Sequence, residues 1–471
     1  MIYRKYMNFS TPSGFTFGSS LEVYDWISGF INMERGQSIR SFRLDRMKIL
    51  ADLGGNPETC APAIHVAGSK GKGSVTGMAT AILNKAGFLC SSYFSPHVMD
   101  FRERLSLGTH FFDENTYCIA GDELRRITET LINSGNREYS IFNKENENGE
   151  EPTFFELITL WYFLCSRAAK VNAMAVETGM GGRLDATNII EPLVSVITII
   201  ELEHTEILGD TIAAIAGEKA GIIKNGRPAL VAGQKDEALK VFQKKAGETG
   251  SPLFYFPEWG EIDDLRLKKD GSCFNLKLKN PIDGAIHNFK DLFLPIPGEN
   301  QVENAGLAIM AVKIAFPEIP ENAIRKALEE FSIPARFQRV LSDPVFIIDG
   351  AHTCRSAESV LKTFRYLYGN GGVLIFGCAD GKDVKAMASL FLPCFSRIII
   401  TRPGTFKKSS PEGVYEVFCQ LAPVGESKPE ILFIPETEKA LNLALELGRT
   451  LNLPILGTGS FYLAGELHKA L

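Results

Sequence analysis

A glycine-rich segment, GSKGKGS at residues 68–74, has the composition of a loop that binds phosphate groups. It follows the short apolar run Ala63–Ala67, which predicts a strand, and it precedes a stretch whose spacing predicts a helix. Glycines let the backbone approach an anion, Lys72 adds a positive charge, and the Ser74 hydroxyl can reach a phosphate-bound magnesium ion. The strict P-loop pattern is not met, because Gly73 separates Lys72 from Ser74. An ordinary strand-to-helix turn is therefore the alternative.

Two more candidate residues follow predicted strands. Glu177 comes directly after the apolar run Val171–Val176, and His204 follows Val194–Ile200. Open α/β sheets place ligand-binding groups at the carboxyl ends of their strands. Magnesium prefers oxygen ligands, so its chemistry favours Glu177, whereas His204 is equally well interpreted as a hydrogen-bonded histidine at a strand end. Lys219, near the end of an amphipathic segment, is by its pattern alone a solvent-facing lysine.

The elements that would position these side chains form two series. The first contains the predicted strands 63–67, 171–176, 194–200 and 228–231, separated by segments long enough for crossover helices. This spacing predicts a doubly wound, mostly parallel sheet. Shorter alternating stretches over residues 252–287 predict a small antiparallel addition to it.

A second series begins after residue 335, with VFIID, VLIFG, RIIIT, ILFIP and PILGTGS, each about one helix length from the next. These five runs predict a smaller, Rossmann-like parallel α/β domain. A chain of 471 residues is long enough for two domains. We expect the boundary near 332–337, which gives domains 1–333 and 334–471.

Composition excludes several classes of protein. The formal net charge of -6 argues against a general nucleic-acid or membrane-surface binder. Nine cysteines without a C-x-x-C pair indicate neither a disulfide framework nor a zinc site, which favours a reducing compartment. The start, MIYRKYMNFSTPSG, lacks the apolar core of a secretion signal, and no apolar run approaches the roughly 20 residues that cross a bilayer. We expect a cytoplasmic protein.

The glycine-rich loop belongs to a longer, ordered set of motifs. They are HVAGSKGKGS (65–74), SPH (95–97), DFRER (100–104), PTFFE (152–156), ETGMGGRLDATN (177–188), EHTEILGDTIAAIAGEKAGIIK (203–224), NQVENA (300–305), AR (335–336), DGAH (349–352) and GSFYLAGE (459–466). In this order they resemble the folylpolyglutamate synthase and dihydrofolate synthase family of the Mur ligase superfamily. The resemblance implies a P-loop-type ATP-binding domain and a smaller Rossmann-like carboxy-terminal domain that closes over the nucleotide.

The same resemblance implies an ATP-dependent ligase that adds L-glutamate to a folate-type carboxylate through an acyl phosphate. Its substrates would be folate or dihydropteroate, L-glutamate and ATP, with two Mg²⁺ ions, and the protein would be a monomer that binds neither nucleic acid nor membrane. The residues carried over are Lys72, Lys219 and His352 as catalytic groups; Gly68, Gly71, Lys72, Gly73, Ser74, Asn304, Arg336 and Asp349 at the nucleotide; Ser95, Glu177 and His204 at the metal; and Thr153, Phe155, Glu156 and Asp185 at the acceptor substrate. Lys219 would be carbamylated, which turns a cation into an anionic oxygen ligand.

The chain departs from the family pattern at the nucleotide-facing junction. Asn300 stands where His is common, Ile333 and Ala335 stand where Trp and Gly precede the arginine, and Thr353 and Cys354 follow DGAH. Two alternatives stay open at this stage. One is a Mur-type peptide ligase, against which DFRER and LDATN speak, and the other is a nucleotide-binding regulatory protein without ligase activity. The sequence leaves open whether dihydropteroate, a reduced folate or both are accepted.

Overall fold

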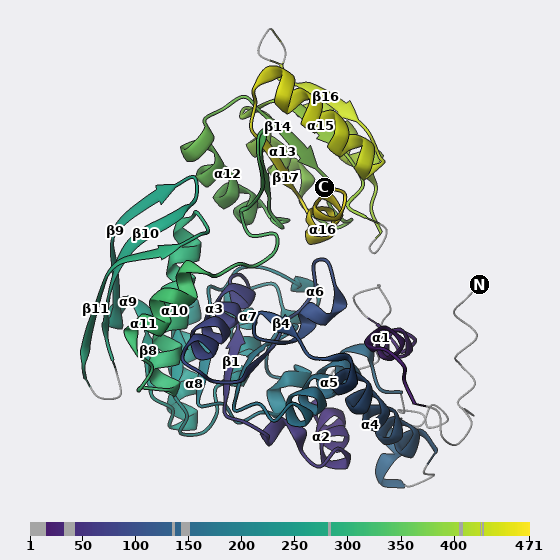
Figure 1. The fold of residues 1–471 in the computed structure, drawn as a ribbon, viewed down its shortest axis with the longest axis vertical. Helices are drawn as coiled ribbons and strands as arrows, with labels where there is room; N and C mark the ends of the chain where they lie inside the picture. Colours follow the sequence, from purple (N-terminus) through teal and green to yellow (C-terminus); the bar gives the residue numbers. More distant parts are fainter. Residues whose placement is uncertain are drawn as a thin grey trace.

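The computed structural model describes residues 16–32, 43–133, 137–142, 151–280, 284–404, 408–423, 425 and 428–471. Within them the chain forms an eight-stranded sheet, a three-stranded sheet and a six-stranded sheet. Figure 1 shows the eight-stranded sheet and its helices below, and the six-stranded sheet with its own helices above.

The eight-stranded sheet has the order β4-β3-β2-β5-β1-β6-β7-β8. Its strands are β1 (Ala63–Ala67), β2 (Cys90–Tyr93), β3 (Leu105–Leu107), β4 (His110–Phe111), β5 (Ala173–Glu177), β6 (Val194–Ile197), β7 (Ala229–Val231) and β8 (Leu253–Tyr255). The six strands from β2 to β8 in this order run parallel, and only β3 and β4 at one edge are antiparallel. The predicted doubly wound, mostly parallel sheet is therefore confirmed.

Alternate residues of the central strands face opposite helical layers. In β5, Ala173 and Ala175 belong to one apolar core, and Met174 and Val176 belong to another. The helices on the first side are α3 (Lys72–Lys85), α10 (Glu299–Ala315) and α11 (Glu321–Glu329). Those on the other side are α1 (Ser20–Ile27), α2 (Leu44–Leu53), α4 (Glu114–Asn133), α5 (Phe154–Ala168), α7 (Ile212–Lys219) and α8 (Asp236–Thr249).

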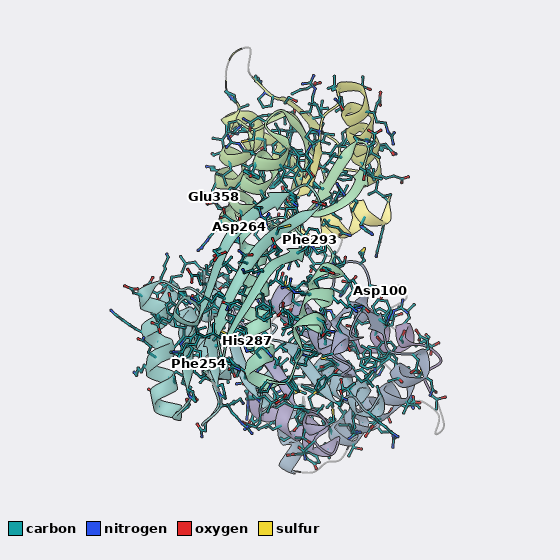
Figure 2. The ribbon with its side chains drawn as sticks, turned by 60° about the vertical axis from the view of Figure 1, so that its left-hand side comes forward. Asp100, Phe254, Asp264, His287, Phe293 and Glu358 are labelled. Atoms are coloured by element: carbon teal, nitrogen blue, oxygen red, sulfur yellow. The ribbon has the colours of Figure 1, made fainter. Side chains whose placement is uncertain are left out.

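The antiparallel addition is present, but it begins and ends later than the predicted range 252–287. The expectation covered residues from 252 onward, but residues 253–255 form β8 and join the parallel sheet beside β7. The antiparallel sheet consists of β9 (Gly260–Lys268), β10 (Gly271–Lys279) and β11 (Ile286–Leu294). Figure 2 shows this sheet beside the larger one, with His287 at its lower end, and Asp264 and Phe293 at the end nearer the carboxy-terminal part.

The six-stranded sheet has the order β12-β13-β17-β14-β15-β16. Its strands are β12 (Gln338–Ser342), β13 (Val345–Ile348), β14 (Gly372–Phe376), β15 (Phe395–Ile400), β16 (Glu430–Phe433) and β17 (Ile455–Thr458). The last five are the five predicted runs, and all pair in parallel. The antiparallel edge strand β12 was not predicted. Helices of this part are α12 (Cys354–Tyr368), α13 (Val384–Phe391), α14 (Pro411–Leu421), α15 (Thr437–Leu451) and α16 (Phe461–Lys469).

In the part of the chain that the structure describes, no helix combines the length and the apolar character needed to cross a membrane.

Candidate active site

The carboxyl ends of β1, β5, β6 and β13 open onto one cleft of about 1040 Å³, which lies between the two α/β parts. The cleft brings together most of the residues predicted from the sequence. Those that line it are Gly71, Lys72, Gly73, Ser74, Ser95, Glu177, His204 and Asn304 from the first part, and Arg336, Asp349 and His352 from the second. Gly68, Lys219, Thr153, Phe155, Glu156 and Asp185 lie outside its lining.

The glycine-rich loop connects β1 to α3 and is held tightly on both sides. Gly68 has a φ of +148°, and a Cβ there would lie 1.8 Å from Thr198 Oγ1. Gly71 has a φ of +90°, and a Cβ there would lie 2.4 Å from Asn304 Oδ1. Any residue other than glycine would therefore clash with its neighbours at both positions. Lys72 Nζ donates to the Gly68 carbonyl oxygen at 2.9 Å, so the lysine lies along its own loop.

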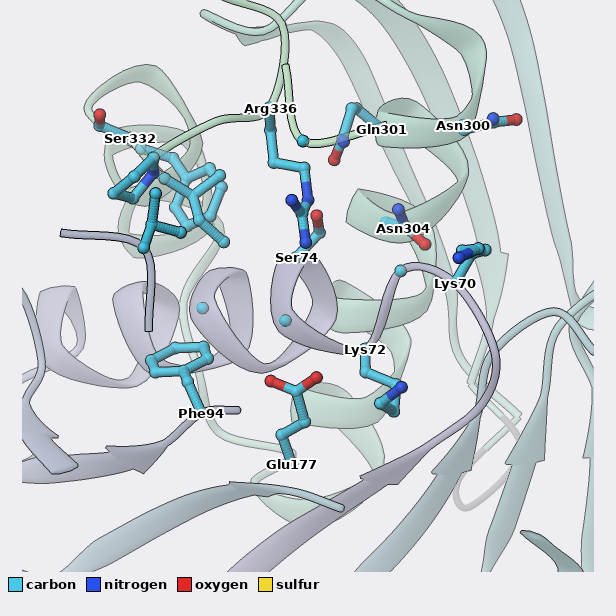
Figure 3. Close-up of a pocket in the computed structure, with 18 of the residues that line it drawn as sticks. Lys70, Lys72, Ser74, Phe94, Glu177, Asn300, Gln301, Asn304, Ser332 and Arg336 are labelled. Atoms are coloured by element: carbon cyan, nitrogen blue, oxygen red, sulfur yellow. The ribbon is translucent and has the colours of Figure 1, made fainter. Parts of the chain in front are cut away.

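Glu177 ends β5 beneath this loop, and two serine hydroxyls accompany it. Burial raises the pKa of Glu177 to about 7, against the opposing effect of the Lys72 charge. The Ser95 N–H donates to Glu177 Oε2 at 3.4 Å. The hydroxyl oxygens of Ser74 and Ser95 are buried and have no hydrogen-bond partner among the described residues. Figure 3 shows the Glu177 carboxylate near the start of α3, and Ser74 on the side of that helix that faces Arg336.

This donor set fits a magnesium ion. No group of three His, Cys, Asp or Glu side chains that could hold a metal occurs in the described ranges, so a metal here would depend on the hydroxyls as well. A carboxylate and two unpartnered hydroxyls supply the oxygen ligands that magnesium prefers. His204 is the N-cap residue of α6 (Thr205–Leu208), has a φ of +47° and lines the same cleft. Burial lowers its pKa, which favours the neutral imidazole that ligates metals.

Lys219 lies behind the loop, at the end of α7. Its side chain is 1% exposed, and its Nζ donates to the Gly68 carbonyl oxygen at 2.8 Å and to Glu203 Oε1 at 2.9 Å. Burial lowers the pKa of Lys219 to about 8. Burial acts to raise the pKa of Glu203, but the charges of Lys219 and Lys72 outweigh it and lower that pKa to about 2. Glu203 was not among the residues predicted from the sequence, although its place directly before His204 was an available signal.

The second part contributes an arginine, a carboxyl group and a histidine. Arg336 lies over the Phe461 ring, with its guanidinium carbon 4.3 Å from the ring centroid. The backbone N–H groups of Phe337 and Ala351 donate to the Asp349 carboxylate at 2.7 and 2.8 Å. Burial raises the pKa of Asp349, and the charge of Arg336 opposes this. The carboxylate thus fixes the backbone next to Arg336.

The residues flanking Arg336 adopt an unusual backbone conformation. Ala335 has a φ of +54° and Phe337 a φ of +43°. The left-handed region is costly for residues other than glycine, by roughly 1 kcal/mol or more each. Ala335 is the position where the family pattern has glycine, so this departure leaves the turn in place and adds backbone strain.

His352 follows β13, and its hydrogen bonds define its tautomer. Its Nδ1 lies 2.8 Å from the Gly350 carbonyl oxygen. A carbonyl oxygen only accepts, so Nδ1 carries the hydrogen and Nε2 is an acceptor. Burial lowers the pKa of His352 to about 3, which keeps the ring neutral.

Two of the predicted acceptor-substrate residues have structural partners. Thr153 and Glu156 form a capping box at the start of α5. The Glu156 carboxylate is also paired with Arg46, through Oε1 at 2.9 Å from Nε and Oε2 at 3.1 Å from Nη2. Both partners are buried, with side-chain exposures of 10% and 5%. Glu156 therefore holds α5 and α2 together.

We expect Glu156→Gln to lower the free energy of unfolding by about 3 kcal/mol, because it removes the carboxylate charge that faces the buried Arg46 guanidinium. Urea unfolding would measure this. The matched control is Glu123→Gln, which breaks the half-exposed pair with Arg167 and should cost under about 1 kcal/mol. An unchanged stability together with a raised KM for the acceptor substrate would instead make Glu156 a substrate-binding residue.

Phe155 and Asp185 shape the turn that follows Glu177. The Phe155 ring packs against Gly179, where a Cβ would lie 2.3 Å from the ring, and Gly179 lines the cleft. The Asp185 carboxylate accepts from the Met180 N–H at 2.8 Å and from the Thr187 hydroxyl at 2.6 Å. These contacts fix the turn and direct Asp185 toward the backbone.

Comparison with known proteins places the chain among ligases. The family model described as "Mur ligase middle domain" matches residues 124–312, and that described as "Mur ligase, glutamate ligase domain" matches residues 335–460. The folylpolyglutamate synthase of Lacticaseibacillus casei is 32% identical over 426 residues, which cover 88% of this chain and 91% of that protein. The dihydrofolate synthase/folylpolyglutamate synthase of Bacillus subtilis is 32% identical over 350 residues, which cover 73% of this chain and 77% of that protein. A solved folylpolyglutamate synthase in complex with AMPPCP and folate is similar with a TM-score of 0.78 and 27% identity, covering 96% of this chain and 100% of that one.

Proposed function

This chain belongs to the folylpolyglutamate synthase and dihydrofolate synthase family, and on that premise we propose that it is an ATP-dependent ligase that joins L-glutamate to a folate-type carboxylate. One observation carries the proposal. A single cleft holds a phosphate-binding loop, an oxygen-rich set around Glu177, and the Arg336, Asp349 and His352 group of the second part. Such a cleft can hold a nucleotide, an acceptor carboxylate and an amine together.

The chemistry explains why these groups are needed. A carboxylate does not react with an amine at neutral pH, because its leaving group would be oxide. When a carboxylate oxygen attacks the γ-phosphorus of ATP, ADP leaves and an acyl phosphate forms. The glutamate amine then attacks the acyl carbon, inorganic phosphate leaves, and the amine loses a proton. Catalysis depends mostly on positioning and on neutralising several anions at one place.

ATP binding is supported by the loop and by the relative solved with AMPPCP. The loop N–H groups and Lys72 would bind the phosphates, and Asn304, which lies against Gly71, would contact the nucleotide. Arg336 reaches the same space from the second part (Figure 3). A phosphate group bound by both Lys72 and Arg336 would join the two parts of the chain.

Magnesium would be held by Glu177, Ser95 and His204, with Ser74 at a phosphate-bound ion. When bound, the metal neutralises charge on the phosphate oxygens. The buried, unpartnered hydroxyls of Ser74 and Ser95 support this assignment, because buried polar groups without partners are uncommon in proteins.

We propose that Lys219 is carbamylated in the active enzyme. Carbon dioxide reacts with an uncharged amine, and the lowered pKa of Lys219 increases the uncharged fraction. The carbamate would then stand beside Glu203, which now lies 2.9 Å from Nζ. Two anions so close require a cation between them, and a second magnesium ion would supply that charge.

Four further predictions accompany the ligase. We propose domains 1–333 and 334–471. This division is supported by the change of sheet between β11, which belongs to the three-stranded sheet, and β12, which belongs to the six-stranded sheet. A cytoplasmic location fits nine cysteines that the structure describes without a disulfide. Thr153, Phe155, Glu156 and Asp185 remain predicted acceptor-site residues, and the monomeric state remains a prediction.

Magnesium-dependent ADP formation tests the proposed function. We expect the purified protein to release ADP from ATP in the presence of glutamate when either dihydropteroate or tetrahydrofolate is added, and omission of glutamate should suppress it. The active acceptor identifies which carboxylate is extended. ATP binding without ADP release with either acceptor would instead support a regulatory nucleotide-binding protein.

A further inference from the structure

Lys70 is a second lysine of the phosphate loop, and the proposed ligase mechanism does not use it. It lies between Ser69 and Gly71, and it lines the cleft. The loop is fixed beside it, because Ser69 Oγ accepts from the Glu201 N–H at 3.0 Å and donates to the Glu201 carbonyl oxygen at 3.1 Å. The turn at Gly71 then separates Lys70 from Lys72, and Figure 3 shows the two lysines on either side of the loop.

The acidic side chains nearest to Lys70 are paired with other cations. Glu203 is bonded to Lys219 at 2.9 Å, and Glu201 is bonded to Arg355 at 3.2 Å. Among the residues that the structure describes, Lys70 itself forms no ion pair. Burial lowers the pKa of Lys70, and the charges of Glu203 and Glu201 oppose this from a longer distance. Lys70 is thus a partly buried cation in the cleft without an ion-pair partner in the described ranges, and such a site is suited to an incoming anion.

The hydrogen bond of Lys70 is weak and reaches across the cleft. Its Nζ lies 3.5 Å from Nε2 of His352, in the second part of the chain. Nε2 is the acceptor nitrogen of a neutral ring, because Nδ1 donates to Gly350. A hydrogen bond between an ammonium group and an anionic oxygen is shorter and stronger than this one. An anion bound at the loop would therefore replace His352 as the hydrogen-bond partner of Lys70.

We propose that Lys70 is a further phosphate-binding residue of the ligase, which exchanges His352 Nε2 for an oxygen of the nucleotide phosphates when ATP binds. This inference rests on the proposed function. The exchange also releases Nε2 of His352, so that the imidazole can contact a substrate only after nucleotide has entered. Lys70 would thereby link phosphate binding to a side chain of the carboxy-terminal part.

Titration calorimetry with AMPPCP and magnesium, on the full-length protein, tests this. Lys70→Met should weaken AMPPCP binding by at least about tenfold, because it removes a charged hydrogen bond and keeps the length of the side chain. Lys70→Arg should bind within about threefold of the unchanged protein, since the charge is kept. Lys326→Met, which removes an exposed lysine of α11 outside the cleft, is the matched control and should have no effect.

Steady-state assays complete the test. In Lys70→Met we expect the KM for ATP to rise while the KM for glutamate stays the same. AMPPCP binding equal to that of the unchanged protein would overturn the inference, and so would a rise confined to the KM for glutamate, which would assign Lys70 to a carboxylate. Thermal unfolding of both Lys70 variants would show that they fold. Failure of the unchanged protein to bind AMPPCP or to form ADP is a separate result, and it would overturn the proposed function together with this inference.

Discussion

Glu177→Gln should lower the rate of ADP formation by at least about 10²-fold at saturating ATP, glutamate and acceptor. Glu177 is the carboxylate of a set whose other oxygen donors, Ser74 and Ser95, are neutral hydroxyls. The substitution keeps the shape of the side chain and removes its negative charge, so these oxygen donors would no longer neutralise the charge of a divalent cation. Rates measured over a range of magnesium concentrations should show that the variant needs more metal than the unchanged protein.

Nucleotide binding separates loss of metal from loss of fold in this experiment. AMPPCP affinity should depend less on magnesium in Glu177→Gln, while the thermal unfolding temperature stays close to that of the unchanged protein. The control is Glu321→Gln, which removes an exposed carboxylate paired with Arg325 on α11. An unchanged rate and an unchanged magnesium dependence in Glu177→Gln would exclude this carboxylate as a metal ligand.

The strands that position this site could be predicted because they are continuous apolar runs. Strands β1, β5, β6 and β7 are buried on both faces, and apart from His65, Glu177 and Ser195 all their residues are apolar. Strand β2, with the sequence CSSY, gave no such signal. Its serine hydroxyls are satisfied by residues of other elements, with Ser91 bonded to Tyr162, 71 positions away, and Ser92 to Ser106, 14 positions away. A polar strand can be buried when such partners exist, and local pattern does not show them.

The same limit applies to the site. Strand ends and motif order singled out Glu177, His204 and Arg336 as candidates, and all three line the cleft. The role of Lys70 depends on His352, which lies 282 positions further along the chain. Likewise, the pairing of Glu156 with Arg46 spans 110 positions. Interactions between distant residues decide which polar side chains face the cleft and which hold helices together.

Lys219→Ala should also lower ADP formation by at least about 10²-fold, and its rescue would identify the chemical form of the lysine. Lys219 is buried behind the loop, bonded to Gly68 and Glu203, so its loss leaves a polar gap next to the phosphate site. If the working form is the carbamate, a small carboxylate such as formate or acetate could enter the gap and replace the missing negative group. We therefore expect these anions to restore part of the activity.

A second additive distinguishes the two forms of Lys219. Methylammonium would replace a lysine that works as a cation paired with Glu203, whereas it would not replace a carbamate. Lys240→Ala, at an exposed position on α8, controls for effects of the additives themselves and should respond to neither. Rescue by formate alone would support the carbamate, because only an anion of that size matches the lost group. Rescue by methylammonium alone, or by neither in a folded variant, would contradict it and leave the observed ion pair with Glu203 as the working arrangement.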